Sequence, residues 1–93
     1  MSLRVIDNPA ELRYELYADD ELAGEIRYRR LPNALALVHT DVEPKRHGLG
    51  NELVKGALDD MRARGLGVVP ICPFILAYIR RHPEYADLVV EEE

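Results

Sequence analysis

The chain lacks several features that define whole classes of proteins. It has one cysteine in 93 residues, so no disulfide can form within it and nothing indicates a secretory compartment. No apolar run approaches the ~18 residues of a membrane-spanning helix, and the N-terminus lacks a signal-peptide pattern. The formal net charge is -5, so the basic surface that supplies most nucleic-acid affinity is missing. We expect a cytoplasmic protein that binds neither membranes nor nucleic acid.

Linkers and metal-binding clusters are also missing. No repeat, low-complexity stretch or linker divides the sequence, so residues 1–93 are expected to form one small domain. Three scattered histidines and one cysteine do not have the spacing of a zinc site, and we expect no metal. With 47% hydrophobic residues the chain can form a core, although a domain of this size should be only modestly stable. A bound ligand should therefore stabilise it measurably.

What the N-terminal half does contain is alternation of apolar and polar residues, which is typical of strands. Residues 11–18 and 21–30 predict an antiparallel hairpin around a turn at Asp19-Asp20, with apolar side chains inward at Leu12, Tyr14, Leu16, Ala18, Leu22, Ile26 and Tyr28. After a turn at 31–33, residues 34–42 are apolar on both faces, which predicts a central strand covered on both sides. Residues 3–6 are expected to add a short edge strand.

The C-terminal half predicts a helix, a strand and a second helix. Apolar residues recur at helical spacing from about Gly48 to Arg64, and Gly65 can end the helix. A short apolar strand follows at 68–71, which implies a parallel pair with a right-handed crossover. Pro70 has no N–H to donate, so the two parallel strands should separate near it and leave backbone groups for an extended ligand. The second helix is expected from Pro73 to about His82, with Cys72 at its N-terminus.

The most informative stretch is the connection between the central strand and the first helix. It is basic at Lys45, Arg46 and His47, and then carries Gly48-Leu49-Gly50 as the helix opens. Glycines let a backbone approach a ligand closely. The first N–H groups of a helix lack internal partners and lie at the positive end of its dipole. This combination favours a pyrophosphate-binding loop, although a glycine-rich turn with solvated basic residues has the same appearance.

Taken together, these elements resemble the core of the GNAT superfamily of N-acetyltransferases. The superfamily's loop is [Arg/Gln]-x-x-Gly-x-[Gly/Ala], and here residues 45–50 match it with Lys at the first position. Small stand-alone members share four linked elements, which are found here as His39-Thr40, Gly48-Leu49-Gly50, Pro70-Ile71-Cys72-Pro73 and His82-Pro83. The resemblance implies an α/β (α+β) fold with an N-terminal antiparallel meander, then strand–helix–strand with a splayed parallel pair, and a C-terminal helix.

The same resemblance implies a ligand and a reaction. The ligand is acetyl-coenzyme A as co-substrate, and the reaction is acyl transfer to an unidentified amine. Coenzyme contacts are implied at the end of the central strand and along the loop, at Val42, Lys45, Arg46, His47, Gly48, Leu49, Gly50 and Asn51. The acceptor is not implied, and the chain is expected to be a monomer or a weak homodimer.

Two residues are candidates for chemistry. Cys72 lies at a helix N-terminus, which lowers a thiol pKa. It can serve as a covalent nucleophile, as an acid that protonates the departing coenzyme A thiolate, or as a buried structural residue. His39, on the central strand, is either the general base that deprotonates the amine or a structural histidine. The alternatives to an enzyme are a non-catalytic acyl-coenzyme A binding module and a protein-interaction domain that keeps only the fold.

Overall fold

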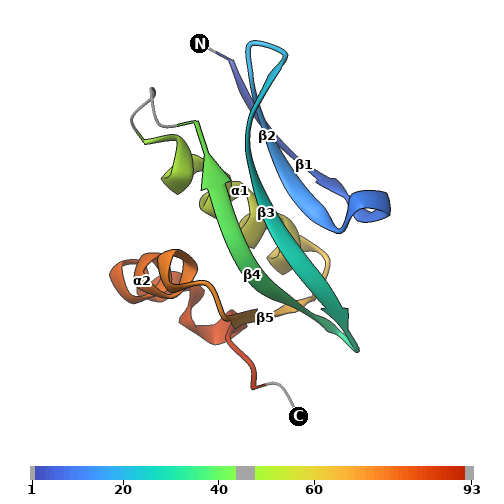
Figure 1. Cartoon of the computed structure of the whole chain (residues 1–93). Helices are drawn as coiled ribbons and strands as arrows, with labels where there is room; N and C mark the ends of the chain where they lie inside the picture. Colours follow the sequence, from blue (N-terminus) through green and yellow to red (C-terminus); the bar gives the residue numbers. More distant parts are fainter. Residues whose placement is uncertain (1, 44–47, 92–93) are drawn as a thin grey trace.

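The protein is a five-stranded mixed sheet with two α-helices, seen in a computed structural model that describes residues 2–43 and 48–91 (Figure 1). The strands are β1 Leu3–Asn8, β2 Arg13–Ala18, β3 Glu21–Leu31, β4 Ala34–Val42 and β5 Gly67–Pro70. The helices are α1 Leu49–Ala63 and α2 Pro73–Arg81, with short 3-10 helices η1 Pro9–Glu11 and η2 Pro83–Leu88. The strands lie in the order β1-β2-β3-β4-β5, antiparallel up to β4, and β5 runs parallel to β4. The predicted fold class is confirmed.

The core lies between α1 and one face of the sheet. The apolar stripe of α1 is fully buried, as its helical spacing predicted, at Leu53, Leu58 and Met61 among others. From β2 and β3 it meets the inward side chains Tyr14, Leu16 and Ile26, which are also fully buried. In Figure 1, α1 lies behind the sheet, and the face of β1 to β4 turned to the viewer carries no described helix.

The parallel pair is short and then opens. β5 pairs with β4 from Gly67 opposite Ala34 to Pro70 opposite Leu37. The last backbone contact is the Cys72 N–H, which donates to the Leu37 carbonyl at 2.9 Å. Beyond Leu37, the strand pairing of β4 within residues 2–43 and 48–91 is with β3 alone. The predicted separation near Pro70 is confirmed.

Two residues predicted to point inward are exposed instead. Leu12 is 42% exposed because it ends η1 in a left-handed conformation (φ 53°) and precedes β2. Leu22 is 49% exposed because the pairing of β2 with β3 contains a β-bulge: Leu16 faces Gly24 and the next residue, Tyr17, faces Leu22. Ala23 therefore takes the buried position. An extra residue in one strand reverses the alternation of sides across it, which explains the exposure of Leu22.

The prediction that residues 34–42 are covered on both faces holds only for the first half of β4. Residues 34–37 are buried, whereas Val38, His39 and Asp41 are exposed. The change occurs at a second β-bulge, since Tyr28 of β3 faces Leu37 and Arg27 faces His39, which leaves Val38 without a partner residue. This bulge coincides with the point at which β5 stops pairing.

Candidate active site at the opening between β4 and β5

The first turn of α1 forms one side of the opening. Gly48 is its N-cap, with φ +80°, and no side chain caps the helix. The first described helical bond is from the Glu52 N–H to the Gly48 carbonyl, 3.2 Å, so the preceding N–H groups have no partner inside the helix. A Cβ built at Gly48 would have no atom within 4 Å, so the space beside it is open. Leu49 is buried and fixes the turn to the core, and Asn51 is exposed.

The other residues predicted to contact the coenzyme are in the loop before α1 and at the end of β4. Lys45, Arg46 and His47 lie outside the described residues, so their contacts stay predictions. Val42 is half-buried at the end of β4, opposite Gly24, and its side chain packs against the core. Val42 lies beyond the part of β4 that pairs with β5, and its contact with a ligand also stays a prediction.

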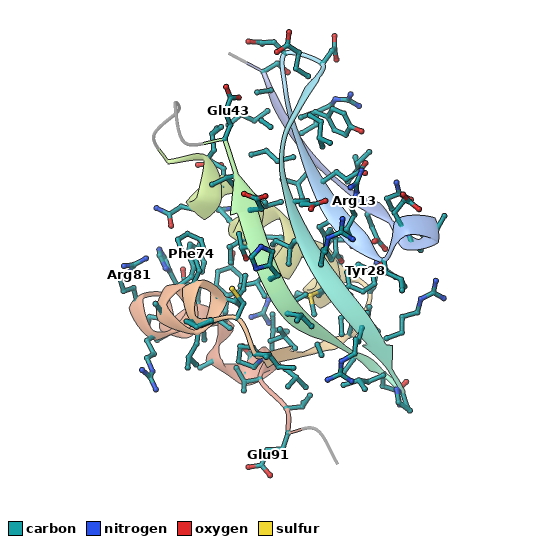
Figure 2. All side chains as sticks on the ribbon, in the orientation of Figure 1. Arg13, Tyr28, Glu43, Phe74, Arg81 and Glu91 are labelled. Atoms are coloured by element: carbon teal, nitrogen blue, oxygen red, sulfur yellow. The ribbon has the colours of Figure 1, made fainter. Side chains whose placement is uncertain are left out.

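Gly50 has a packing reason to be glycine. A Cβ built there would lie 2.8 Å from Cζ of Phe74, the second residue of α2. Because real Cβ atoms do not approach so closely, any side chain at position 50 would displace the ring. Figure 2 shows the Phe74 ring between α2 and the first turn of α1. The N-termini of the two helices are therefore in contact beside the free part of β4.

Cys72 forms the other side of the opening as the N-cap of α2. Its side chain is 7% exposed, and its thiol donates a long hydrogen bond of 3.5 Å to the Thr40 hydroxyl. When the thiol loses its proton, the sulfur becomes the acceptor and the Thr40 hydroxyl the donor. Burial opposes ionisation, but this hydrogen bond and those from the N–H groups of Ile75 and Phe74 outweigh it. The pKa of Cys72 therefore lies below its ordinary value. Thr40, which the sequence showed only as part of the His39-Thr40 element, is therefore also a site residue.

His39 is not brought to Cys72. Consecutive residues of a strand point to opposite faces, and Thr40 points to the thiol. The exposed His39 side chain therefore lies on the other face of β4, across from Arg27. Its predicted role as a base remains possible only for an acceptor that approaches from that face, and it stays a prediction.

A cavity of about 430 Å³ lies along β3, between β2 and the end of β4. Among its lining residues are Arg13, Leu22, Gly24, Glu25, Asp41 and Glu43. Figure 2 labels two of them, Arg13 on β2 and Glu43 just beyond β4. Sequence reasoning did not find this cavity because it joins residues from three strands.

The charge of the cavity is negative on balance. The Arg13 guanidinium is held by Glu25 at 2.7 Å and by Glu15, also at 2.7 Å, which is only 3% exposed. Glu25 and Asp41 face each other directly across β3 and β4, and Glu43 follows on the same rim. Three carboxylates thus line the cavity with one guanidinium, an arrangement that favours a cationic group.

No group of three or more histidine, cysteine or acidic side chains is placed to hold a metal among the residues that the structure describes. Within the same residues, no helix is long and apolar enough to cross a membrane.

Comparisons with known proteins identify the family. The sequence model described as GCN5-related N-acetyl-transferase matches residues 13–88. No curated protein matches. Among solved structures, a GCN5-like N-acetyltransferase candidate from Staphylococcus aureus, studied in solution, superposes with a TM-score of 0.71. It covers 98% of this chain and 91% of its own, at 22% identity, a level that supports the fold alone. The family match includes β2 to η2, and with it every described site residue. The chain therefore belongs to the GCN5-related N-acetyltransferase family, and its reaction class is acyl transfer.

Proposed function

We propose that this protein transfers an acetyl group from acetyl-coenzyme A to an amine. The observation that carries the proposal is the edge of β4 that faces away from β3, which from Val38 to Val42 is not paired with β5 and lies between the N-termini of α1 and α2. An extended ligand can pair with such an edge, as a missing strand would. Both ends of this edge carry helix N–H groups that favour negative charge.

The described residues fit the coenzyme at two points. The free N–H groups behind Gly48, with open space beside them, suit a pyrophosphate. Cys72 and Thr40 lie further along β4, where the thioester of a ligand that follows the edge would arrive. Acetyl-coenzyme A supplies the activated acyl group when it is bound.

Cys72 is proposed to act as a nucleophile rather than as an acid. The hydrogen bonds that lower its pKa increase the thiolate fraction near neutral pH, and a thiolate attacks a carbonyl but cannot donate a proton. In that route the sulfur of Cys72 bonds to the acetyl carbon as the bond from that carbon to the coenzyme sulfur breaks. The coenzyme leaves as its thiolate, which takes up a proton from water. The amine then takes the acetyl group and loses a proton to a base, which restores the Cys72 thiolate. Direct attack by the amine is the alternative, and it does not use Cys72.

The amine acceptor is supported by the charge of the cavity. Its carboxylates at Glu25, Asp41 and Glu43 suit the ammonium form of an amine, which is the form present at neutral pH. The cavity is lined by the same strand that carries His39, two residues from Asp41. A histidine there would accept the proton that the amine must lose before it reacts.

Calorimetric titration with acetyl-coenzyme A, and with coenzyme A in parallel, tests the binding part. We expect one-to-one binding that Gly48→Glu removes. Gly65→Glu is a matched control, because Gly65 also has positive φ (+71°) and open surroundings but follows the other end of α1. The two variants should lose similar stability, since a side chain in this conformation is strained in both. Equal loss of binding in both variants, or no binding by the unmodified chain, would overturn the loop assignment.

Turnover tests the chemical part. Release of coenzyme A from acetyl-coenzyme A is followed with a panel of primary amines, first for the unmodified chain and then for Cys72→Ser. We expect the variant to keep its affinity for coenzyme A and to lose most of its activity. Unchanged activity would remove Cys72 from the chemistry and favour direct attack. Binding without turnover on any amine would instead indicate a non-catalytic acyl-coenzyme A binding module.

A further inference from the structure

The Phe74 side chain is large and apolar, yet it is partly exposed to solvent. It is the only phenylalanine of the chain, and 39% of it is exposed although most large apolar side chains here are buried. It is the second residue of α2 and follows directly after Cys72 and Pro73. The ring therefore lies at the opening between the two helices and not within the core (Figure 2).

Gly50 fixes where this ring lies. The ring edge occupies the space of a side chain at position 50, with Cζ 2.8 Å and Cε2 3.2 Å from the place of the missing Cβ. This packing contact holds the ring in one place, and an ordered ring spares a ligand the cost of ordering it. One side of the ring is thus held by the helix that opens at Gly48, and the rest is left free to contact something else.

The ring also lies between the first turn of α1 and Cys72. The proposed function assigns the pyrophosphate of the coenzyme to the first and its thioester to the second. On one side are the free N–H groups of the first turn of α1, which suit the pyrophosphate. On the other is Cys72, in contact with Thr40, where the proposed function places the thioester. The part of the coenzyme between these two groups is the pantetheine arm, a flexible chain of methylenes and two amides. Methylenes and amide planes pack well on an aromatic face, and a half-exposed ring supplies one.

We propose that Phe74 is a specificity-determining residue that recognises the pantetheine arm, and that Gly50 is glycine in order to hold the ring against the route of that arm. This inference rests on the proposed coenzyme A binding. It separates two contributions to affinity: the α1 N-terminus binds the phosphates, and Phe74 binds the chain that follows them. Truncation of the ring should therefore weaken only those ligands that carry the arm.

Two ligands distinguish these contributions in a calorimetric titration. Coenzyme A carries the arm, whereas adenosine 3′-phosphate 5′-diphosphate keeps the nucleotide and the pyrophosphate and lacks the arm. For Phe74→Ala we expect coenzyme A affinity to fall on the order of tenfold, the change that corresponds to about 1.4 kcal/mol, while the affinity for the shorter nucleotide stays the same. Phe74→Leu, which keeps apolar bulk and protects folding, should lose an intermediate amount. Leu12→Ala is the control, because Leu12 is similarly exposed (42%) but adjoins η1.

Each outcome of this titration tells whether Phe74 contacts the pantetheine arm. An equal fall for both ligands would mean that the ring only supports the packing of α1 on α2, and no fall for either would mean that it does not contact the arm; both results overturn the inference. Thermal unfolding of each variant checks that the loss is not caused by unfolding. If the unmodified chain binds neither ligand, the coenzyme A proposal itself fails, which is a different result from a selective or unselective effect of Phe74.

Discussion

The single cysteine of this chain lies at the N-terminus of α2, and a side chain from another element contacts its sulfur. The Thr40 hydroxyl contacts the Cys72 sulfur across the opening, 32 residues away in sequence. The N–H groups of Ile75 and Phe74 belong to α2 itself and would accompany any N-cap residue. Thr40 is therefore the side chain through which β4 tunes the thiol, and it can be changed without altering the helix.

Thr40→Val removes the hydroxyl and keeps the shape of the side chain. Without this hydrogen bond the thiolate is less stable, so the pKa of Cys72 should rise and the thiolate fraction at neutral pH should fall. A hydrogen bond is worth ~1 kcal/mol, so alkylation at pH 7 should be about fivefold slower. The rate of iodoacetamide modification, measured from pH 6 to 10, reports the pKa, and no other thiol competes. Thr40→Ser, which keeps the hydroxyl, should behave like the unmodified chain; equal rates for the serine and valine variants would remove Thr40 from this role.

At the scale of the elements, much of the fold could be predicted because each signal was local. The stripe of α1 and the missing N–H of Pro70 depend on neighbours along the chain, and they gave the helix and the separation of β4 from β5 correctly. The two β-bulges depend on how neighbouring strands pair, so the sequence of one strand does not contain them. The sides of Leu22 and Val38 could not be foreseen for that reason.

The candidate site divides in the same way. Gly48 and Cys72 could be found because a positive φ and a helix N-terminus leave local signals. Thr40, Phe74 and the carboxylates of the cavity act through contacts between separate elements. Position 50 illustrates the difference: the sequence suggested a glycine that a ligand approaches, whereas the structure gives it a neighbour on another helix.

The contact between Gly50 and Phe74 predicts that a substitution at position 50 changes stability by different amounts with and without the ring. Alanine is better than glycine in a helix by up to ~1 kcal/mol, so Gly50→Ala should stabilise α1 unless the new Cβ meets the Phe74 ring. In the unmodified chain we expect no gain, because the ring must swing away from its place. In a Phe74→Ala background the same substitution should raise the free energy of unfolding. Urea unfolding of the four proteins measures the difference, expected to be on the order of 0.5–2 kcal/mol; the same effect in both backgrounds would mean that the two residues do not interact.

At the scale of the whole molecule, the outer edge of β5 is covered by another segment, whereas the edge of β4 beyond Leu37 is not covered by any described strand. The outer edge of β5 is covered by the C-terminal segment, where the Val90 N–H donates to the Val68 carbonyl at 2.9 Å and Val89 bridges to Val68. Exposed strand edges are prone to pair with other chains, and this segment prevents such pairing at β5. The length of β4 beyond Leu37 carries no such cover from any described strand. The fold thus closes the edge next to the opening and leaves the opening itself available.

A domain of this size has little stability to spare, so binding at this opening should change the stability of the whole molecule. A ligand that binds only the folded state at one hundred times its Kd adds about 2.7 kcal/mol. For a domain of 93 residues each kcal/mol shifts the Tm by roughly 4–8 °C. We therefore expect acetyl-coenzyme A at that ratio to raise the Tm by about 10–20 °C, measured by calorimetry or circular dichroism. Gly65→Glu should keep the full rise from its lower starting Tm, and Gly48→Glu should lose it. An equal rise in both variants would place the ligand away from the first turn of α1, because only that turn distinguishes them.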